Sequence, residues 1–424
     1  MWSDISDRCI HTTQRNKLRA TFIILVALVC GVSVALLAQT PDTATIQGLV
    51  EDPNHQPVSG AAITVTNVRS GLSRAEIADG HGKFSMPGLP VAGDYEIVAA
   101  KHGFAKAHLQ GIGLVGGRLA NVHLQLNLAS RMTHITVTGT VGNVRTDTPQ
   151  LGDRLGAREM EETPLLNRRI TYLPLLNSAN RPALNQGDVF MNQDLFTTNG
   201  SGRRQTWFEI DGANGVDTWG RQTIFTNLPL AAVQEMTVIQ NAFSADYGFG
   251  LGGVVNIVTK SGGNRYHGEV LGLWRPSAPE AKLSGFMPAT AGSGNDITND
   301  TLQQGAASIS GPLGTDGKTQ IFLSGQASRQ DRASPVTSPI APGNFIGHYR
   351  SWLAFLRLDH RIDAANNLFL HSNVDSFHDT NPNGTVGGNS LPSVDRIFRK
   401  QTYSQEFGET AVIRPSLVNN LRLQ

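Results

Sequence analysis

The chain contains little cysteine and little net charge. Only two of its 424 residues are cysteine, Cys9 and Cys30. If the N-terminal segment is removed, the remaining chain has neither a disulfide framework nor a thiolate metal site. Lysine and arginine number 35 against 34 aspartate and glutamate residues. This balance implies no polyanionic partner, so we expect no nucleic acid binding.

Long hydrophobic runs are also scarce. One run, residues 20–38, is near the length of a spanning helix, follows a basic segment and ends in small residues. That order is typical of a secretory signal, so residues 1–38 are predicted to be a signal peptide, with an uncleaved anchor as the alternative. Any later membrane insertion must then use β-strands. The 45 glycines and a hydrophobic share of only 39% agree with a mainly β chain rich in turns.

Residues 43–128 predict a small β-sandwich. Short β-rich runs such as Thr45–Val50 and Ala62–Thr66 alternate with turn signals such as Asp79-Gly80. The segment resembles the carboxypeptidase-regulatory-like domain, a transthyretin-type sandwich. Despite that name we predict no enzyme, because no His-x-x-Glu pair, the usual zinc-peptidase ligand pair, occurs in the chain. We expect no catalytic residue, metal or cofactor, and interpret this domain as structural.

The stretch Val233–Gly263 is rich in glycine. Its β-branched run, residues 254–258, has glycines on both sides. Glycine weakens a strand unless another backbone comes close or φ must be positive. The pattern therefore predicts a strand wedged against other backbone.

The order of residues in this stretch resembles the C-terminal signature of the plug domain of TonB-dependent outer-membrane receptors. The shared features are a Tyr-Gly pair, a Gly-Gly pair and a hydrophobic Asn-Ile-Val-Thr-Lys run, and an earlier strand ending in an Asp-Gly turn also matches. The resemblance implies that residues 129–263 form a mixed α/β plug domain. Its signature residues, interpreted as structural, are Asp211, Gly212, Tyr247, Gly248, Gly252, Gly253, Asn256 and Lys260.

Two details refine this interpretation. Asp211 could suggest catalysis, but an aspartate at a strand end usually bonds local backbone amides, so we predict a turn-capping role. Residues 240–244 read Gln-Asn-Ala-Phe-Ser where many siderophore receptors carry Arg-Gly-Pro. This departure weakens any inference of iron specificity and favours the Oar-like subgroup, which bears the N-terminal sandwich.

A short β-rich strip precedes the predicted plug. It consists of Ile135, Thr136, Val137 and Thr138. In the receptors that the chain resembles, a segment before the plug pairs by strand addition with TonB, the energising periplasmic protein. Such pairing needs only an exposed extended edge, because the main chain makes the bonds. These four residues are therefore the candidate TonB-contacting strip, and the alternative is that they form the first plug strand.

From Arg265 onward apolar and polar residues alternate with period two, which predicts strands with one apolar and one polar face. The connections alternate in length, as the loops and turns of outer-membrane barrels do. We therefore expect residues 264–424 to be the N-terminal part of an antiparallel transmembrane β-barrel, with a soluble sandwich as the alternative. The seven candidate strands are 265–274, 302–310, 319–330, 349–360, 366–377, 401–413 and 417–424. The long connections are 275–301, 331–348 and 378–400; the short ones are 311–318, 361–367 and 414–416.

Seven strands could not close around a plug, because plugged lumens need about 22 strands. An open sheet edge in lipid would also leave backbone groups unpaired. We therefore expect the sequence to be an N-terminal fragment of a longer receptor.

The leading functional hypothesis is a transport receptor of the cell outer membrane, with the plug and sandwich facing the periplasm. It implies three partners: a TonB-type energising protein, outer-membrane lipid and an unidentified extracellular ligand. A surface adhesion or interaction protein and a non-functional truncated product are the alternatives. The sequence does not identify the ligand.

Overall fold

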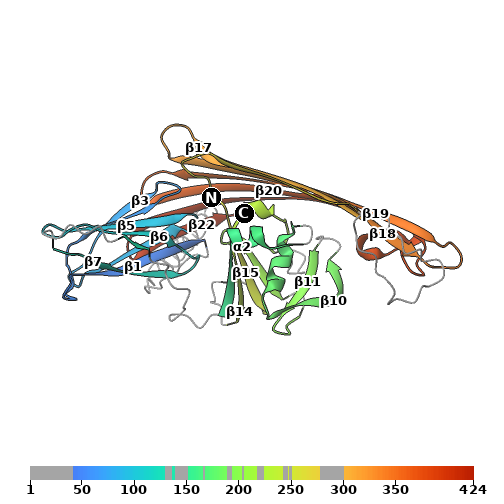
Figure 1. Ribbon diagram of the computed structural model, residues 1–424, viewed down its shortest axis with the longest axis horizontal. Helices are drawn as coiled ribbons and strands as arrows, with labels where there is room; N and C mark the ends of the chain where they lie inside the picture. Colours follow the sequence, from blue (N-terminus) through green and yellow to red (C-terminus); the bar gives the residue numbers. More distant parts are fainter. Residues whose placement is uncertain are drawn as a thin grey trace, which may run out of the picture. The chain divides into compact units, whose positions relative to one another are not determined.

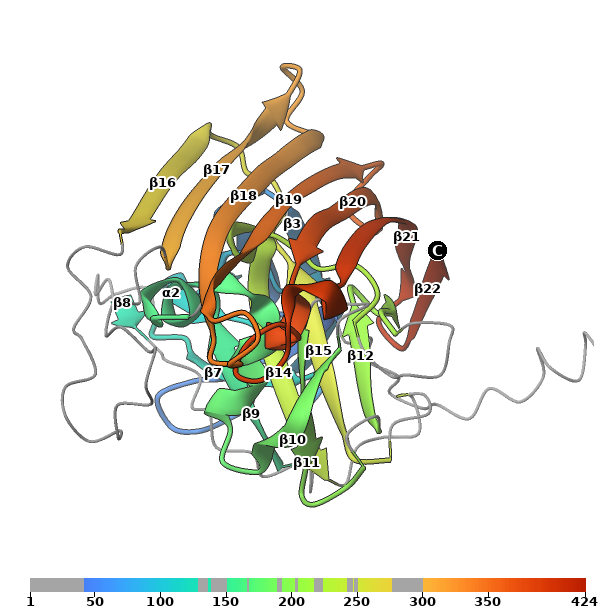
Figure 2. The ribbon, with the colours of Figure 1, turned by 90° about the vertical axis from the view of Figure 1, so that its right-hand side faces the viewer.

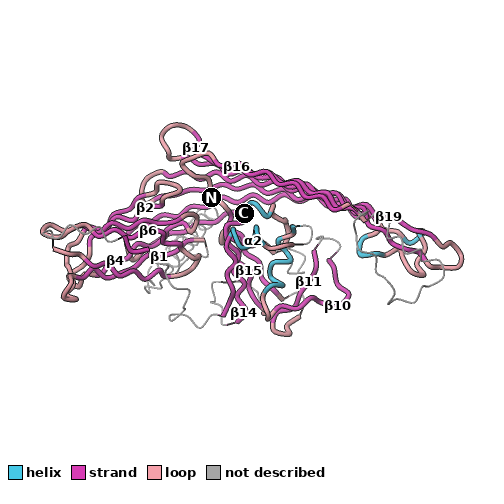
Figure 3. The backbone as a smooth tube through the Cα atoms, in the orientation of Figure 1, coloured by secondary structure: helices cyan, strands magenta, loops and turns pink. Residues whose placement is uncertain are grey.

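A computed structural model describes residues 42–128, 136–138, 151–165, 168–188, 193–202, 205–216, 224–241, 247, 251–276 and 300–424. These residues are mainly β-structure, as predicted (Figure 1, Figure 3). The helical pieces are short: α2 (Ala157–Glu162) and the 3-10 turns η2 (Ile170–Leu176), η3 (Leu230–Ala232), η4 (Pro382–Gly384) and η5 (Pro392–Val394). Within these ranges, no helix is both long and apolar enough to cross a membrane. The predicted signal peptide lies outside the described residues.

The N-terminal region forms the predicted sandwich of two sheets. One sheet has the order β4-β1-β7 and the other the order β3-β2-β5-β6-β8. The alternating pattern buries every second side chain, as in β5, and the core includes Ile46, Ile63, Tyr95 and Ile97. The strands are β1 (Thr43–Glu51), β2 (Ala62–Asn67), β3 (Ser73–Ile77), β4 (Lys83–Pro90), β5 (Asp94–Ala100), β6 (Ala107–Gly113), β7 (Leu119–Gln125) and β8 (Thr136–Thr138).

Strand β8 contains three of the four residues of the candidate TonB-contacting strip. It pairs in parallel with β6, with Val137 opposite Leu109. It is thus the last strand of a sandwich sheet among the described residues, and the alternative that it opens the plug sheet is wrong. Ile135 lies outside the described residues.

The described part of residues 151–263, called the candidate plug below, contains a mixed five-stranded sheet with the order β13-β12-β15-β14-β9. Strand β15 lies at its centre, parallel to β12 and antiparallel to β14. Beside this sheet, β10 and β11 form a hairpin. The strands are β9 (Leu151–Gly156), β10 (Asn180–Asp188), β11 (Gln193–Thr198), β12 (Thr206–Ile210), β13 (Ala213–Asn214), β14 (Val233–Asn241) and β15 (Gly253–Thr259).

The C-terminal region is one antiparallel sheet of seven strands, called the wall sheet below. Its strands lie side by side in chain order, and Figure 2 shows them as a curved sheet. Strands form where they were predicted, with one correction. Residues 331–348 are not a long connection: β18 and β19 extend into them and leave only 337–342 between the strands. The strands are β16 (His267–Arg275), β17 (Thr301–Leu313), β18 (Thr319–Val336), β19 (Gly343–Arg361), β20 (Asn366–Thr380), β21 (Ile397–Arg414) and β22 (Leu417–Leu423).

The two faces of the wall sheet differ as the alternation predicted. On β18 the side chains from Phe322 to Gln330 at even positions are buried, and the intervening residues are more exposed. Phe322 and Phe355 pack into the hydrophobic core of the candidate plug. The face that carries them is therefore called the inward face, and the opposite face the outward face.

Candidate functional site: the junction of plug and wall

The signature strand β15 is buried along its whole length, at all seven of its residues. A Cβ on Gly253 would lie 3.0 Å from the Ile239 carbonyl oxygen and 3.0 Å from a methyl group of Thr198. Neither Gly252 nor Gly253 has a left-handed φ. Close approach of neighbouring chain, rather than positive φ, is thus the reason for glycine here.

The other signature residues of this region have different surroundings. Asn256 is buried in the middle of the sheet, between Glu209 and Thr237 on the neighbouring strands. The Lys260 ammonium donates to the Glu161 carboxylate on α2. Tyr247 is half-buried, and Gly248 lies outside the described residues.

Asp211 and Gly212 form the predicted turn. Both have positive φ, 49° and 87°, and they join β12 to β13 as a two-residue hairpin. Such hairpins require positive φ at both central residues, which is why Asp-Gly is favoured there. The turn prediction is therefore confirmed.

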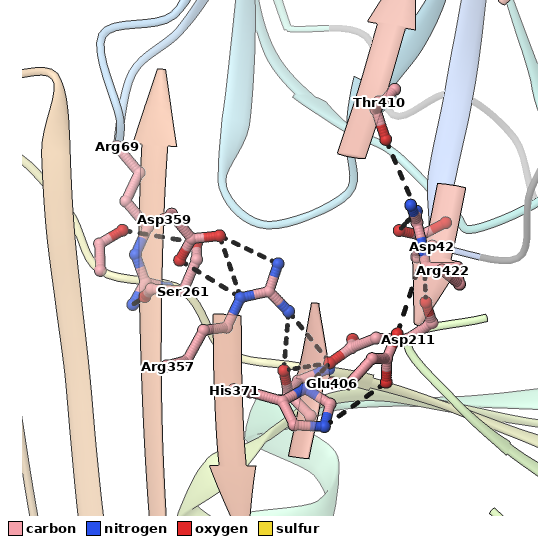
Figure 4. A network of polar contacts seen from close by, with 12 residues as sticks. Asp42, Arg69, Asp211, Ser261, Arg357, Asp359, His371, Glu406, Thr410 and Arg422 are labelled. Atoms are coloured by element: carbon pink, nitrogen blue, oxygen red, sulfur yellow. Dashed lines mark hydrogen bonds and ion pairs between the residues drawn. The ribbon is translucent and has the colours of Figure 1, made fainter. Parts of the chain in front are cut away.

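The predicted role of the Asp211 side chain is wrong. Its carboxylate does not bond the amides of its own turn; it accepts from the N–H of Thr259 at 2.9 Å and from the Thr259 hydroxyl at 2.7 Å. From the wall sheet, Arg357 on β19 approaches to 3.1 Å and His371 on β20 to 3.0 Å. Asp211 is fully buried. It is thus the centre of a contact between candidate plug and wall (Figure 4).

Arg357 places a positive charge beside the buried Asp211 carboxylate. Its guanidinium also donates to the Thr259 hydroxyl at 2.7 Å and to Asp359 at 3.0 Å. Burial alone would raise the pKa of Asp211, but Arg357, His371 and the Thr259 hydroxyl outweigh burial and hold this pKa below its usual value. Asp211 is therefore ionised at neutral pH.

His371 lies between two carboxylates. Its Nδ1 is 3.0 Å from Asp211, and its Nε2 is 3.4 Å from Glu406 on β21. Neutral imidazole has a single N–H, so it can donate to only one of the two. The second contact is favourable only if His371 is charged or Glu406 is protonated.

Arg422 on β22 extends the cluster to the N-terminal region. Its Nε donates to the backbone carbonyl of Asp211 at 3.1 Å, and its Nη2 pairs with the Asp42 carboxylate. The same guanidinium lies 5.1 Å from the centre of the Phe369 ring. Figure 4 shows that the cluster therefore joins residues from the start of the sandwich, the plug and the wall.

A second polar contact fixes residues 225–227 of the candidate plug. The Asp375 carboxylate on β20 accepts from Asn227 at 3.1 Å and from Lys400 at 2.9 Å. Lys400 also donates to the carbonyl of Phe225 at 2.9 Å, and Asn373 to the carbonyl of Asn227 at 3.0 Å. The candidate plug is thus held at two places by inward-facing charged and amide side chains.

The sandwich contacts the chain where the plug passes into the wall. Arg69 donates to the Ser261 carbonyl at 2.9 Å, and its own carbonyl accepts from the Asn264 N–H at 2.8 Å. Arg74 donates to the carbonyl of Ala364, in the short turn between β19 and β20, at 2.6 Å. The sandwich therefore lies at the short-turn end of the wall sheet.

The sequence interpretation found Asp211 but missed its partners on the wall. Ionisable residues on the polar faces of the predicted strands, such as His371 and Arg422, were the sequence feature that could have indicated these partners. Within the described ranges, no set of three or more histidine, cysteine or acidic residues is arranged to hold a metal ion. The arrangement offers hydrogen bonds and ion pairs that can break and form again.

Comparison with known proteins agrees with this architecture. Residues 45–127 match the carboxypeptidase regulatory-like domain. The chain is 22% identical over 298 residues to the TonB-dependent transporter Oar of Myxococcus xanthus, covering 70% of this chain. The aligned part is 27% of that protein, so the chain spans about a quarter of the length of this relative. The predicted resemblance to TonB-dependent receptors with an N-terminal regulatory-like domain is confirmed.

Solved structures of outer-membrane receptors are also similar. The ferric enterobactin receptor PfeA of Pseudomonas aeruginosa aligns with a TM-score of 0.43 at 15% identity, covering 61% of this chain and 38% of the receptor. The outer-membrane transporter YddB of Escherichia coli aligns with a TM-score of 0.48 at 13% identity, covering 62% and 37%.

Proposed function

We infer that the protein acts in TonB-dependent transport across the cell outer membrane. In this proposal the wall sheet is part of a barrel, and the candidate plug closes its lumen. A TonB-type protein displaces the plug so that an extracellular ligand passes inward. No covalent step on the ligand is involved.

The observation that carries the proposal is that the contact between the candidate plug and the inward face of the wall sheet is largely polar. The buried inward face of β18 bears Gln320, Ser324, Gln326 and Ser328, and the plug is held through Asp211 and Asp375 rather than by a large apolar contact alone. Hydrogen bonds exchanged for bonds to water cost little net free energy, whereas exposing apolar area costs about 25 cal/mol per Å². A polar junction therefore suits a plug that must leave and return.

Orientation follows from the two ends of the wall sheet. The short turns 314–318, 362–365 and 415–416 lie at the end that Arg74 of the sandwich contacts. Short turns are periplasmic in outer-membrane barrels. The sandwich and plug therefore face the periplasm, and the longer connections face outward.

We assign the TonB contact to residues 135–138. Strand β8 is the last strand of its sheet among the described residues, so its main chain can pair with an added strand. The name of the relative, a TonB-dependent transporter, supports such a partner.

A photo-crosslinking residue at position 137 of the full-length protein tests this assignment. We expect it to capture the periplasmic domain of a TonB-type protein, and the same residue at exposed Asn121 on β7 should not. In a second experiment the crosslinking residue stands at another position of the strip, and Val137 is substituted. Val137→Pro should abolish capture, because proline has no N–H to donate to an added strand, whereas Val137→Thr should preserve it.

Equal capture at positions 121 and 137 would contradict the assignment. Absence of any TonB-type partner, together with loss of cell-contact behaviour on gene deletion, would favour the surface adhesion alternative.

A further inference from the structure

The outward face of the wall sheet carries a line of basic side chains. In the strand register, Arg329 lies opposite Arg350, Arg350 opposite His378, and His378 opposite Arg399. Residues directly opposite one another in antiparallel strands project to the same face. Neighbouring strands are about 4.8 Å apart, so the four side chains span roughly 14 Å. This set is called the basic row.

The basic row is only weakly neutralised by neighbouring carboxylates. Arg329 is 3.9 Å from Asp331, with 55% of its side chain exposed. Arg350 and Arg399 are exposed, and within the described residues neither has a hydrogen bond or ion pair. The Nε2 of His378 is buried and has no partner in the described part of the chain. Like charges directly opposite on adjacent strands destabilise a sheet. An anion bound across the row would remove that cost.

The row stands beside a surface hollow. The hollow has a volume of about 650 Å³ and is lined by Trp274, Arg329 and Arg350. Gly272, Gly305 and Ala327 also line it, and they lie opposite one another on β16, β17 and β18. Their small side chains leave space between the tryptophan and the two arginines.

The position of the row along the strands indicates the ligand. His378 and Arg399 lie next to the long connection 381–396, and Trp274 is 72% exposed beside the connection 276–300. Toward the short turns, the same face becomes apolar, with Leu323 and Leu370 exposed. Aromatic residues flank the apolar band of a transmembrane barrel at the level of the lipid headgroups. The basic row is therefore at headgroup height on the outward-loop side.

We propose that the basic row and its hollow bind a phosphorylated lipid of the outer leaflet, with Arg329 and Arg350 holding phosphate and the hollow receiving part of the lipid body. This rests on the proposed membrane orientation of the wall sheet. Arginine forms paired hydrogen bonds to phosphate oxygens, and basic side chains near a membrane surface attract anionic headgroups.

Lipid binding to the full-length protein tests the proposal. The purified protein is placed in nanodiscs of zwitterionic lipid, and binding of lipid A, a diphosphorylated outer-leaflet lipid, is titrated. We expect Arg329→Gln with Arg350→Gln to weaken binding about 25-fold, the product of roughly fivefold for each arginine. Lys318→Gln, an exposed basic residue in the short turn 314–318, should leave it unchanged.

Three further results make the outcome decisive. Arg329→Lys with Arg350→Lys keeps the charge and should retain most of the binding, which also controls for folding. Inorganic phosphate at millimolar concentration should not displace lipid A; full displacement would mean a free-phosphate site and would overturn the lipid assignment. Unchanged binding by the double glutamine variant would also overturn it. Crosslinking at position 137 in the same variants reports on the transport proposal separately.

Discussion

Replacing Asp211 by asparagine should loosen the plug. The substitution removes the buried negative charge that faces Arg357 and His371 but keeps an oxygen for the Thr259 N–H. Breaking a buried ion pair by removing one partner costs about 3–5 kcal/mol. Arg357 retains Asp359 as a partner, so the loss should lie at the lower end of that range. We therefore expect the free energy that keeps the candidate plug closed to fall by about 3 kcal/mol. This corresponds to a roughly 100-fold rise in the fraction of open plug.

The assay uses a single introduced cysteine. Ser324 lies on the inward face, next to Phe322, and is 2% exposed. Residues 39–424 contain no cysteine, so Ser324→Cys supplies the single thiol of this region. A thiol reagent should label it only when the plug opens, at a rate proportional to the open fraction.

The control is Asp94→Asn, which neutralises an exposed carboxylate of the sandwich. Labelling of Ser324→Cys in the full-length protein should rise about 100-fold with Asp211→Asn and stay constant with Asp94→Asn. Equal rates in both variants would show that the Asp211 cluster does not hold the plug.

Three further predictions concern the glycine signature, His371 and the sandwich. Gly253→Val should lower the denaturation midpoint markedly, because its Cβ would meet Ile239 and Thr198, whereas Gly272→Val, with nothing within 4 Å, should change it little; equal shifts would make the glycine incidental. His371→Leu should increase Ser324→Cys labelling, because it removes the ring nitrogen that lies 3.0 Å from the buried Asp211 carboxylate. An unchanged labelling rate would show that this contact does not hold the candidate plug. Residues 43–128 expressed alone should fold without metal, since they contain their own core, and an unchanged melting temperature after chelation checks this.

The sequence by itself determined the strands, their faces and the turns. Alternation with period two is a property of neighbouring residues, so Leu370 and His371 could be assigned to opposite faces before their partners were known. The Asp211-Gly212 turn could likewise be predicted from the sequence, because positive φ at both positions is a local steric requirement. The expected order of domains, with a plug between the sandwich and the barrel strands, came from the resemblance to plug signatures.

Only the tertiary structure decided which side chains meet. The Asp211 carboxylate contacts Arg357 and His371, whose positions follow from the register of β19 and β20 and from where the plug packs against them. No local pattern encodes that placement, so a general rule for turn aspartates predicted the wrong partner.

The length of β18 shows the same limit in the backbone. Residues 333–336 read Ala-Ser-Pro-Val, a polar and proline-containing segment that favours a loop. In the structure they pair with Gly343–Ile346 of β19, because main-chain groups make the ladder and Pro335 removes only one donor from it. Local composition thus fixed where strands form, and pairing across the sheet decided how far they run.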